Sequence, residues 1–69
     1  MLTILRPDQV IKGLEGNGFH FVKQRGSHRK YKKDSRTVVV PMHYEIAKGT
    51  LSSILEQAGL TLDQLLKYI

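Results

Sequence analysis

The sequence contains no cysteine and no tryptophan, and it has only six acidic residues against eleven lysines and arginines. The absence of cysteine excludes disulfide bonds and thiolate metal clusters, so hydrophobic packing must supply nearly all the stability. The only apolar run near the N-terminus covers residues 1–5 and ends at Arg6 and Pro7. This run is too short for a signal-peptide core or a membrane span. We therefore expect a soluble, cytoplasmic protein with no membrane partner.

The length of the chain limits its organisation. A chain of 69 residues buries only about 60% of the surface that its unfolded form exposes, which leaves room for one small domain over residues 1–69. A two-domain enzyme is excluded. The composition, with 41% hydrophobic and 25% charged residues, is that of a folded globular protein and not of a disordered one.

The chain has a strong net positive charge, and most of its basic residues lie in one segment. A formal net charge of +5 and a pI near 9.8 favour polyanionic partners such as nucleic acid, an anionic membrane surface or an acidic protein. The predicted helices carry too few cations for a membrane-binding face. A solvated face is the simplest interpretation of a basic cluster, and a binding surface is the alternative. Seven basic residues lie between positions 23 and 36: Lys23, Arg25, Arg29, Lys30, Lys32, Lys33 and Arg36.

Hydrophobic spacing and turn residues predict three helices and three strands. Helices are expected where apolar residues recur one turn apart between a capping residue and a glycine, and strands where short aromatic or β-branched runs occur. Thr61 with Gln64 three residues later matches a capping box for the last helix. The order α-β-β-β-α-α predicts an α+β fold, in which helices cover one face of a three-stranded antiparallel sheet. The expected helices are 7–17, 48–58 and a last one from residue 61, and the expected strands are 19–22, a short run around Tyr31, and 37–41.

Strand alternation predicts which side chains occupy the uncovered face of the sheet. Successive strand side chains point to opposite faces. If Phe19, Phe21 and Tyr31 point toward the helices, the uncovered face carries His28 and the lysines nearest to it in the chain, which are Lys30 and Lys32. Keeping Phe21 opposite Tyr31 requires a three-residue loop over residues 25–27 between the first two strands. That loop pairs Val22 with Lys30 and Gln24 with His28.

His28 is the histidine with the most electropositive neighbours. Nearby cations favour neutral imidazole, which is the form that acts as a general base. In RNA the natural proton donor is the ribose 2′-OH, which after deprotonation attacks the adjacent phosphorus and expels the 5′-oxygen. Neighbouring lysines and arginines would hold the phosphate and stabilise its negative charge. The other interpretation is that His28 is a polar residue at the start of an exposed strand.

The remaining polar candidates have weaker support. Gly26 has no side chain and would let a phosphate approach backbone N–H groups, and Ser27 adds a hydroxyl donor. His20 is expected on the uncovered face but too far from His28 to act with it, and His43 is a secondary candidate in a loop. The three histidines do not converge, so no zinc site and no cofactor are expected. The aromatic residues are assigned to the core, and only Tyr44 is left for contact with a ligand.

Two segments together resemble a known family. Residues 23–31 read Lys-Gln-Arg-Gly-Ser-His-Arg-Lys-Tyr, and residues 38–43 read Val-Val-Val-Pro-Met-His. Residues 48–60 add Lys-Gly-Thr-Leu-Ser-Ser-Ile-Leu-Glu-Gln-Ala-Gly-Leu. In combination these motifs resemble the HicA toxin family over nearly the whole chain.

The resemblance implies a fold like the double-stranded RNA-binding domain, metal-independent endonuclease activity on mRNA, and neutralisation by a HicB antitoxin. It also implies that the catalytic residue is His28, which occupies the position of the family's Gly-Ser-His. Two features depart from the family pattern: the loop at residues 43–46 is shorter, and only Lys48 stands where RNA-binding domains bring a lysine-rich helix start. Duplex binding in that manner is therefore not expected.

The sequence thus supports two hypotheses. The first is an endoribonuclease toxin with His28 as general base, acting on single-stranded mRNA and silenced by a HicB-like antitoxin that covers the basic face. The second is a non-catalytic module that binds RNA or an acidic protein through the same face. The residues expected to contact RNA are Lys23, Arg25, Gly26, Ser27, Arg29, Lys30 and Lys32.

Overall fold

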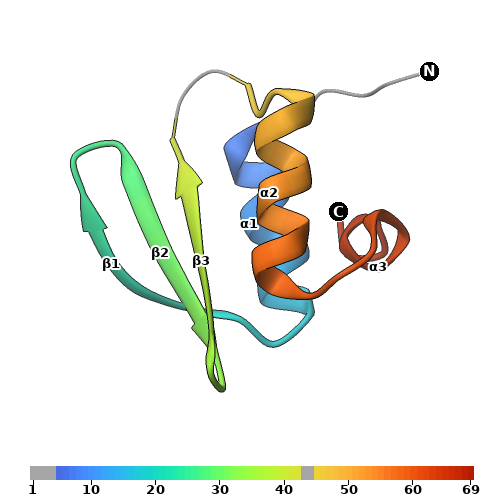
Figure 1. Cartoon of the computed structure of the whole chain (residues 1–69), viewed down its shortest axis with the longest axis horizontal. Helices are drawn as coiled ribbons and strands as arrows, with labels where there is room; N and C mark the ends of the chain where they lie inside the picture. The colour runs from blue at the N-terminus through green and yellow to red at the C-terminus, as the bar shows by residue number, and fades with distance from the viewer. Residues whose placement is uncertain (1–4, 43–44) are drawn as a thin grey trace.

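The computed structural model describes residues 5–42 and 45–69, and it has the predicted α+β fold (Figure 1). The three strands form one antiparallel sheet in the order β1-β2-β3. This arrangement confirms the predicted fold class and is compatible with the fold of the double-stranded RNA-binding domain. The elements are α1 (Pro7–Gly16), β1 (His20–Arg25), β2 (His28–Lys33), β3 (Arg36–Pro41), α2 (Lys48–Ala58) and α3 (Leu62–Leu66).

Local residues determine the helix ends as the sequence predicts. Pro7 occupies the first turn of α1, where a missing N–H costs no hydrogen bond. Gly59 ends α2 with a φ of 69°, a left-handed conformation that glycine adopts without strain. The Thr61 hydroxyl accepts from the Gln64 N–H at 3.2 Å, and Gln64 Oε1 accepts from the Thr61 N–H at 2.8 Å. The predicted capping box of α3 is therefore present.

The helices cover one face of the sheet and lie closest to β3. Helices α1 and α2 pack against β3, and α3 packs against α1 on the side away from the sheet (Figure 1). Close packing of α3 depends on two small residues of α1, because Gly13 lies against Leu65 and Gly16 lies against Tyr68. The core between the layers consists of Leu5, Val10, Ile11, Leu14, Phe19, Tyr31, Val38, Val40, Ile46, Leu51, Ile54, Ala58 and Leu65.

Strand β1 lies at the edge of the sheet that is farthest from the helices (Figure 1). All six of its residues are exposed. Phe21 does face the helix side, where its ring packs edge-on against the buried Tyr31 at a centroid distance of 5.9 Å. Even so, half of the Phe21 side chain is exposed (50%), so the expectation that it belongs to the core is wrong. The helices do not extend over this edge strand.

The hairpin between β1 and β2 also differs from the prediction. Phe21 is paired with Tyr31 as expected, but Gln24 is paired with Arg29 and Arg25 with His28. The predicted three-residue loop is wrong, because the turn contains only Gly26 and Ser27. A β-bulge between Phe21 and Lys23 supplies the missing register shift: one extra residue in β1 is accommodated without a partner of its own.

Two candidates from the sequence, His43 and Tyr44, lie outside the described residues. Their expected roles as a secondary histidine and an available aromatic ring stay predictions. Within residues 5–42 and 45–69, no helix has the length and apolar character needed to cross a lipid bilayer.

Candidate nucleic-acid interface

The bulge in β1 decides which cations share a face with His28. Gln24 lies on the helix side of the sheet. Its Oε1 accepts from Arg29 Nε at 2.9 Å, and Arg29 in turn lies over the ring of Phe21, which faces the helices, at 6.0 Å from the ring centroid. The predicted position of Gln24 beside His28 is therefore wrong. Alternation from Gln24 puts Lys23 and Arg25 on the opposite face, which we call the open face.

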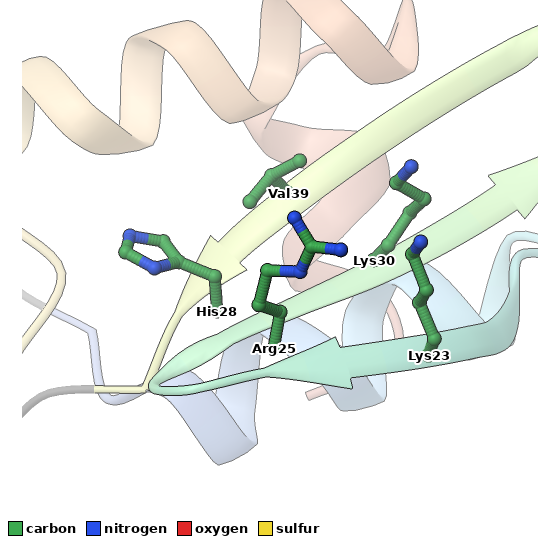
Figure 2. A pocket seen from close by; sticks show the side chains of 5 residues that line it. All are labelled: Lys23, Arg25, His28, Lys30 and Val39. Atoms are coloured by element: carbon green, nitrogen blue, oxygen red, sulfur yellow. The ribbon is translucent and has the colours of Figure 1, made fainter.

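The open face contains a shallow cavity of about 190 Å³. Figure 2 shows its lining side chains rising from the same side of the three strands: Lys23 and Arg25 from β1, His28 and Lys30 from β2, and Val39 from β3. Val39 was not among the predicted site residues, because the sequence indicates only that it belongs to an apolar strand. Its signal is alternation, because Val38 and Val40 are fully buried and the residue between them must face outward.

The cavity is strongly electropositive because three of its five lining residues are cations and none is acidic. Lys23 stands directly opposite Lys30 across the β1–β2 pair, and Arg25 stands opposite His28. Like charges in directly opposed strand positions destabilise a sheet by roughly 0.2–1 kcal/mol. The fold therefore accepts a repulsion here that an anionic ligand would remove.

The turn beside His28 adds backbone groups to this end of the sheet. Gly26 has a φ of 59° at the first central position, which is typical of a type II′ turn and requires glycine. Apart from its chain neighbours, no atom of residues 5–42 and 45–69 lies within 4 Å of the point where a Gly26 Cβ would stand. The Ser27 carbonyl accepts from the Met42 N–H at 2.5 Å, which ties the turn to the end of β3. A ligand anion can thus approach the turn backbone next to His28 and Arg25.

The seven cations of residues 23–36 divide into two groups. Lys33 Nζ donates to the Asn17 carbonyl at 2.7 Å, and Arg36 donates to the Gln57 carbonyl at 3.4 Å. Both contacts stabilise helix C-terminal ends, where cations interact favourably with exposed carbonyls. Arg29 lies on the helix side with Phe21 and Gln24.

The remaining cations, Lys23, Arg25, Lys30 and Lys32, occupy the open face, with Lys32 paired to His20 beyond the cavity. Of the residues expected to contact RNA, the structure therefore brings Lys23, Arg25 and Lys30 together around His28, with Gly26 and Ser27 in the adjoining turn. Lys32 lies farther along the same face, and Arg29 lies on the other one.

Comparison with known proteins relates the chain to a protein family. No curated protein matches the chain. The family described as the HicA toxin of bacterial toxin-antitoxin systems matches residues 7–60, a span that includes every strand, the cavity and both longer helices. The chain therefore belongs to the HicA toxin family and is a toxin that pairs with an antitoxin.

Proposed function

We propose that this toxin is an endoribonuclease that cleaves single-stranded mRNA in the open-face cavity, with His28 as the general base. The observation that supports the proposal is the convergence of one histidine with three cations around a cavity that has no acidic lining residue. The membership of the chain in a toxin family adds a second, independent reason to expect damage to a cellular target.

The reaction uses a nucleophile that the substrate already carries. His28 takes the proton of a ribose 2′-OH, and the 2′-oxygen attacks the adjacent phosphorus. A bond forms between phosphorus and the 2′-oxygen, the bond to the 5′-oxygen breaks, and the departing oxygen takes up a proton from solvent. The products are a 2′,3′-cyclic phosphate and a 5′-hydroxyl end. Because the nucleophile is internal to the RNA, the step requires no metal ion.

The cavity cations bind the reacting phosphate and the phosphates next to it, and they stabilise the negative charge that develops in the transition state. Arg25 lies opposite His28, and its guanidinium suits a two-point contact with phosphate oxygens. Lys23 and Lys30, which are paired with each other across the two strands, act as point charges. The turn at Gly26 and Ser27 offers backbone and hydroxyl donors to the same anion. Lys32 lies farther along the open face, outside the cavity, and adds to its positive potential without a phosphate contact of its own. Arg29 is not needed for this arrangement.

Substitution of His28 by alanine tests the proposal, with His20→Ala as the matched control on the same face. The assay is scission of a labelled single-stranded RNA in excess EDTA, with circular dichroism on every variant. We expect His28→Ala to lose about a hundredfold or more in rate, because general base catalysis contributes on that scale. Because His28 is exposed, we expect the His28→Ala variant to fold, which the circular dichroism spectrum checks. Cleavage by a folded His28→Ala variant at the wild-type rate would remove His28 as the base.

The alternative function is a non-catalytic module that binds RNA or an acidic protein through the same cations. It predicts no scission by any variant, together with a salt-dependent gel shift that His28→Ala leaves unchanged. Detection of a cyclic phosphate end on the product distinguishes the two functions, since binding alone breaks no bond.

The antitoxin that silences such an enzyme must cover His28 or compete with RNA for the cations of the open face. We propose that it is a HicB-like protein with an acidic contact surface, because the surface it must cover carries four cations and no acid among the cavity-lining residues. An acidic surface also competes directly with the phosphates of RNA for the same side chains.

A further inference from the structure

The outer edge of β1 differs from the other edge of the sheet. Within the described part of the chain, no strand pairs with β1 on the side away from β2. At the opposite edge, the Val39 N–H donates to Gln57 Oε1 of α2 at 3.1 Å, so the helix layer satisfies a backbone group of β3. Among the described residues, none gives β1 such cover, and all the residues of β1 are exposed. An uncovered strand edge is a template for pairing with another chain.

The register shows which backbone groups point outward. Arg25 and His28 flank a two-residue turn, and the pair that closes such a turn exchanges both backbone hydrogen bonds. The next pair, Gln24 with Arg29, is therefore a non-hydrogen-bonded pair. The N–H and C=O of Gln24 consequently face away from β2, toward the position of a fourth strand.

The side chains around this edge select the kind of strand that fits. Lys23 and Arg25 flank Gln24 on the open face, and Phe21 and Val22 are 50% and 42% exposed. A second copy of β1 would oppose these cations with like charges, which destabilises strand pairing. A strand with acidic side chains at alternate positions would instead meet Lys23 and Arg25 on one face and Phe21 on the other.

We infer that the antitoxin adds an extended segment with alternating acidic residues to the outer edge of β1 as a fourth strand. Such a strand lies about 4.8 Å from β1, so its carboxylates stand next to Arg25 and Lys23. They neutralise two of the three cations around the cavity without entering it. The inference rests on the proposed function in one respect, since the added strand silences the toxin only if the cavity is the nuclease site.

Two substitutions at one position test the role of the backbone. Gln24→Pro removes the outward N–H, and proline is tolerated on edge strands. Gln24→Ala keeps that N–H but loses the same side-chain bonds to Arg29 and to the Gly26 carbonyl. We expect Gln24→Pro to bind the purified cognate antitoxin at least tenfold more weakly than Gln24→Ala in titration calorimetry. Equal affinities of two folded variants would overturn the inference. The readout is affinity, so it is independent of any failure of the nuclease proposal.

Hydrogen exchange on the wild-type chain tests the same inference without a variant, and decides it if Gln24→Pro does not fold. The Gln24 amide should exchange rapidly in the free toxin and become protected in the complex with the antitoxin. Unchanged exchange in the complex would refute strand addition. Protection in the free toxin that grows with its concentration would assign the edge to a second copy, and protection by RNA alone would assign it to the substrate.

Discussion

The salt dependence of RNA binding counts the phosphates that the cavity contacts. Each phosphate neutralised on a single strand contributes about −0.7 to the slope of log affinity against log salt concentration. Three cations line the cavity: Lys23, Arg25 and Lys30. A contact from each predicts a slope of about −2 and an affinity loss of about 20-fold between 50 and 200 mM salt.

Removing one cation should change this slope by a defined amount. Lys30→Gln, made in the cleavage-deficient His28→Ala background, leaves two phosphate contacts and a slope of about −1.4. The loss of affinity over the same salt range then falls to about sevenfold. Lys12→Gln removes the same charge from the exposed surface of α1, on the helix side of the sheet, and serves as the matched control. The control should keep the slope of the parent, because long-range charge effects are screened within about 10 Å at 0.1 M salt.

Fluorescence anisotropy of a labelled single-stranded RNA, measured at five or more salt concentrations for each variant, gives the slopes. Affinity at a single salt concentration is not sufficient, since any loss of positive charge weakens it. An unchanged slope for Lys30→Gln would refute the assignment of phosphate to the open face. An equal reduction of the slope in Lys30→Gln and Lys12→Gln would also refute it, because it would indicate a diffuse attraction instead of a site.

Two further predictions concern stability and are measured by urea denaturation followed by circular dichroism. Gly13→Ala should destabilise the fold by about 1–2 kcal/mol, because the new Cβ would stand 2.6 Å from the backbone oxygen of Leu65, and this crowding outweighs the gain in helix propensity. At Gly49 no other atom of the described residues lies within 4 Å of the Cβ position, so Gly49→Ala should instead stabilise the fold by about 0.5–1 kcal/mol. A loss of stability in both variants would contradict the packing argument. Thr61→Ala should cost about 1 kcal/mol through loss of the cap on the Gln64 N–H; an unchanged midpoint would show that the cap contributes nothing.

The helices were predictable because their signals are local. Pro7, Gly59 and the Thr61–Gln64 pair fix helix ends through contacts within a few residues, and each acts in the structure as the sequence indicates. The bounds of α2 agree with the expected 48–58 for the same reason. The pairing of Phe21 with Tyr31 was also predictable, because both aromatic rings must lie on the same face.

The rest of the hairpin was not predictable, because a bulge carries no distinctive sequence. Nothing in Val22 or Lys23 distinguishes an extra residue from an ordinary strand position, and strict alternation then assigns the later residues of β1 to the wrong face. The exposure of His28 on the uncovered face was foreseen, whereas the arrival of Lys23 and Arg25 beside it was not. The roles of these residues in binding and cleavage stay predictions. The exposure of β1 beyond the helix layer was also not predictable, since it depends on how far the helices extend across the sheet.

The bulge lets residues 19–25 direct their aromatic side chains toward the helices and their cations toward the open face, which a regular strand with this sequence could not do. Positions 19, 21, 23 and 25 are all odd, yet the first two carry aromatic rings that face the helices and the last two carry cations that face away. In a regular strand all four would share one side. A chain with one residue fewer between the aromatic and the cationic pair would achieve both orientations without a bulge. The number of residues between the aromatic and the cationic pair, and not their composition, therefore determines whether this strand needs a bulge to divide its two faces.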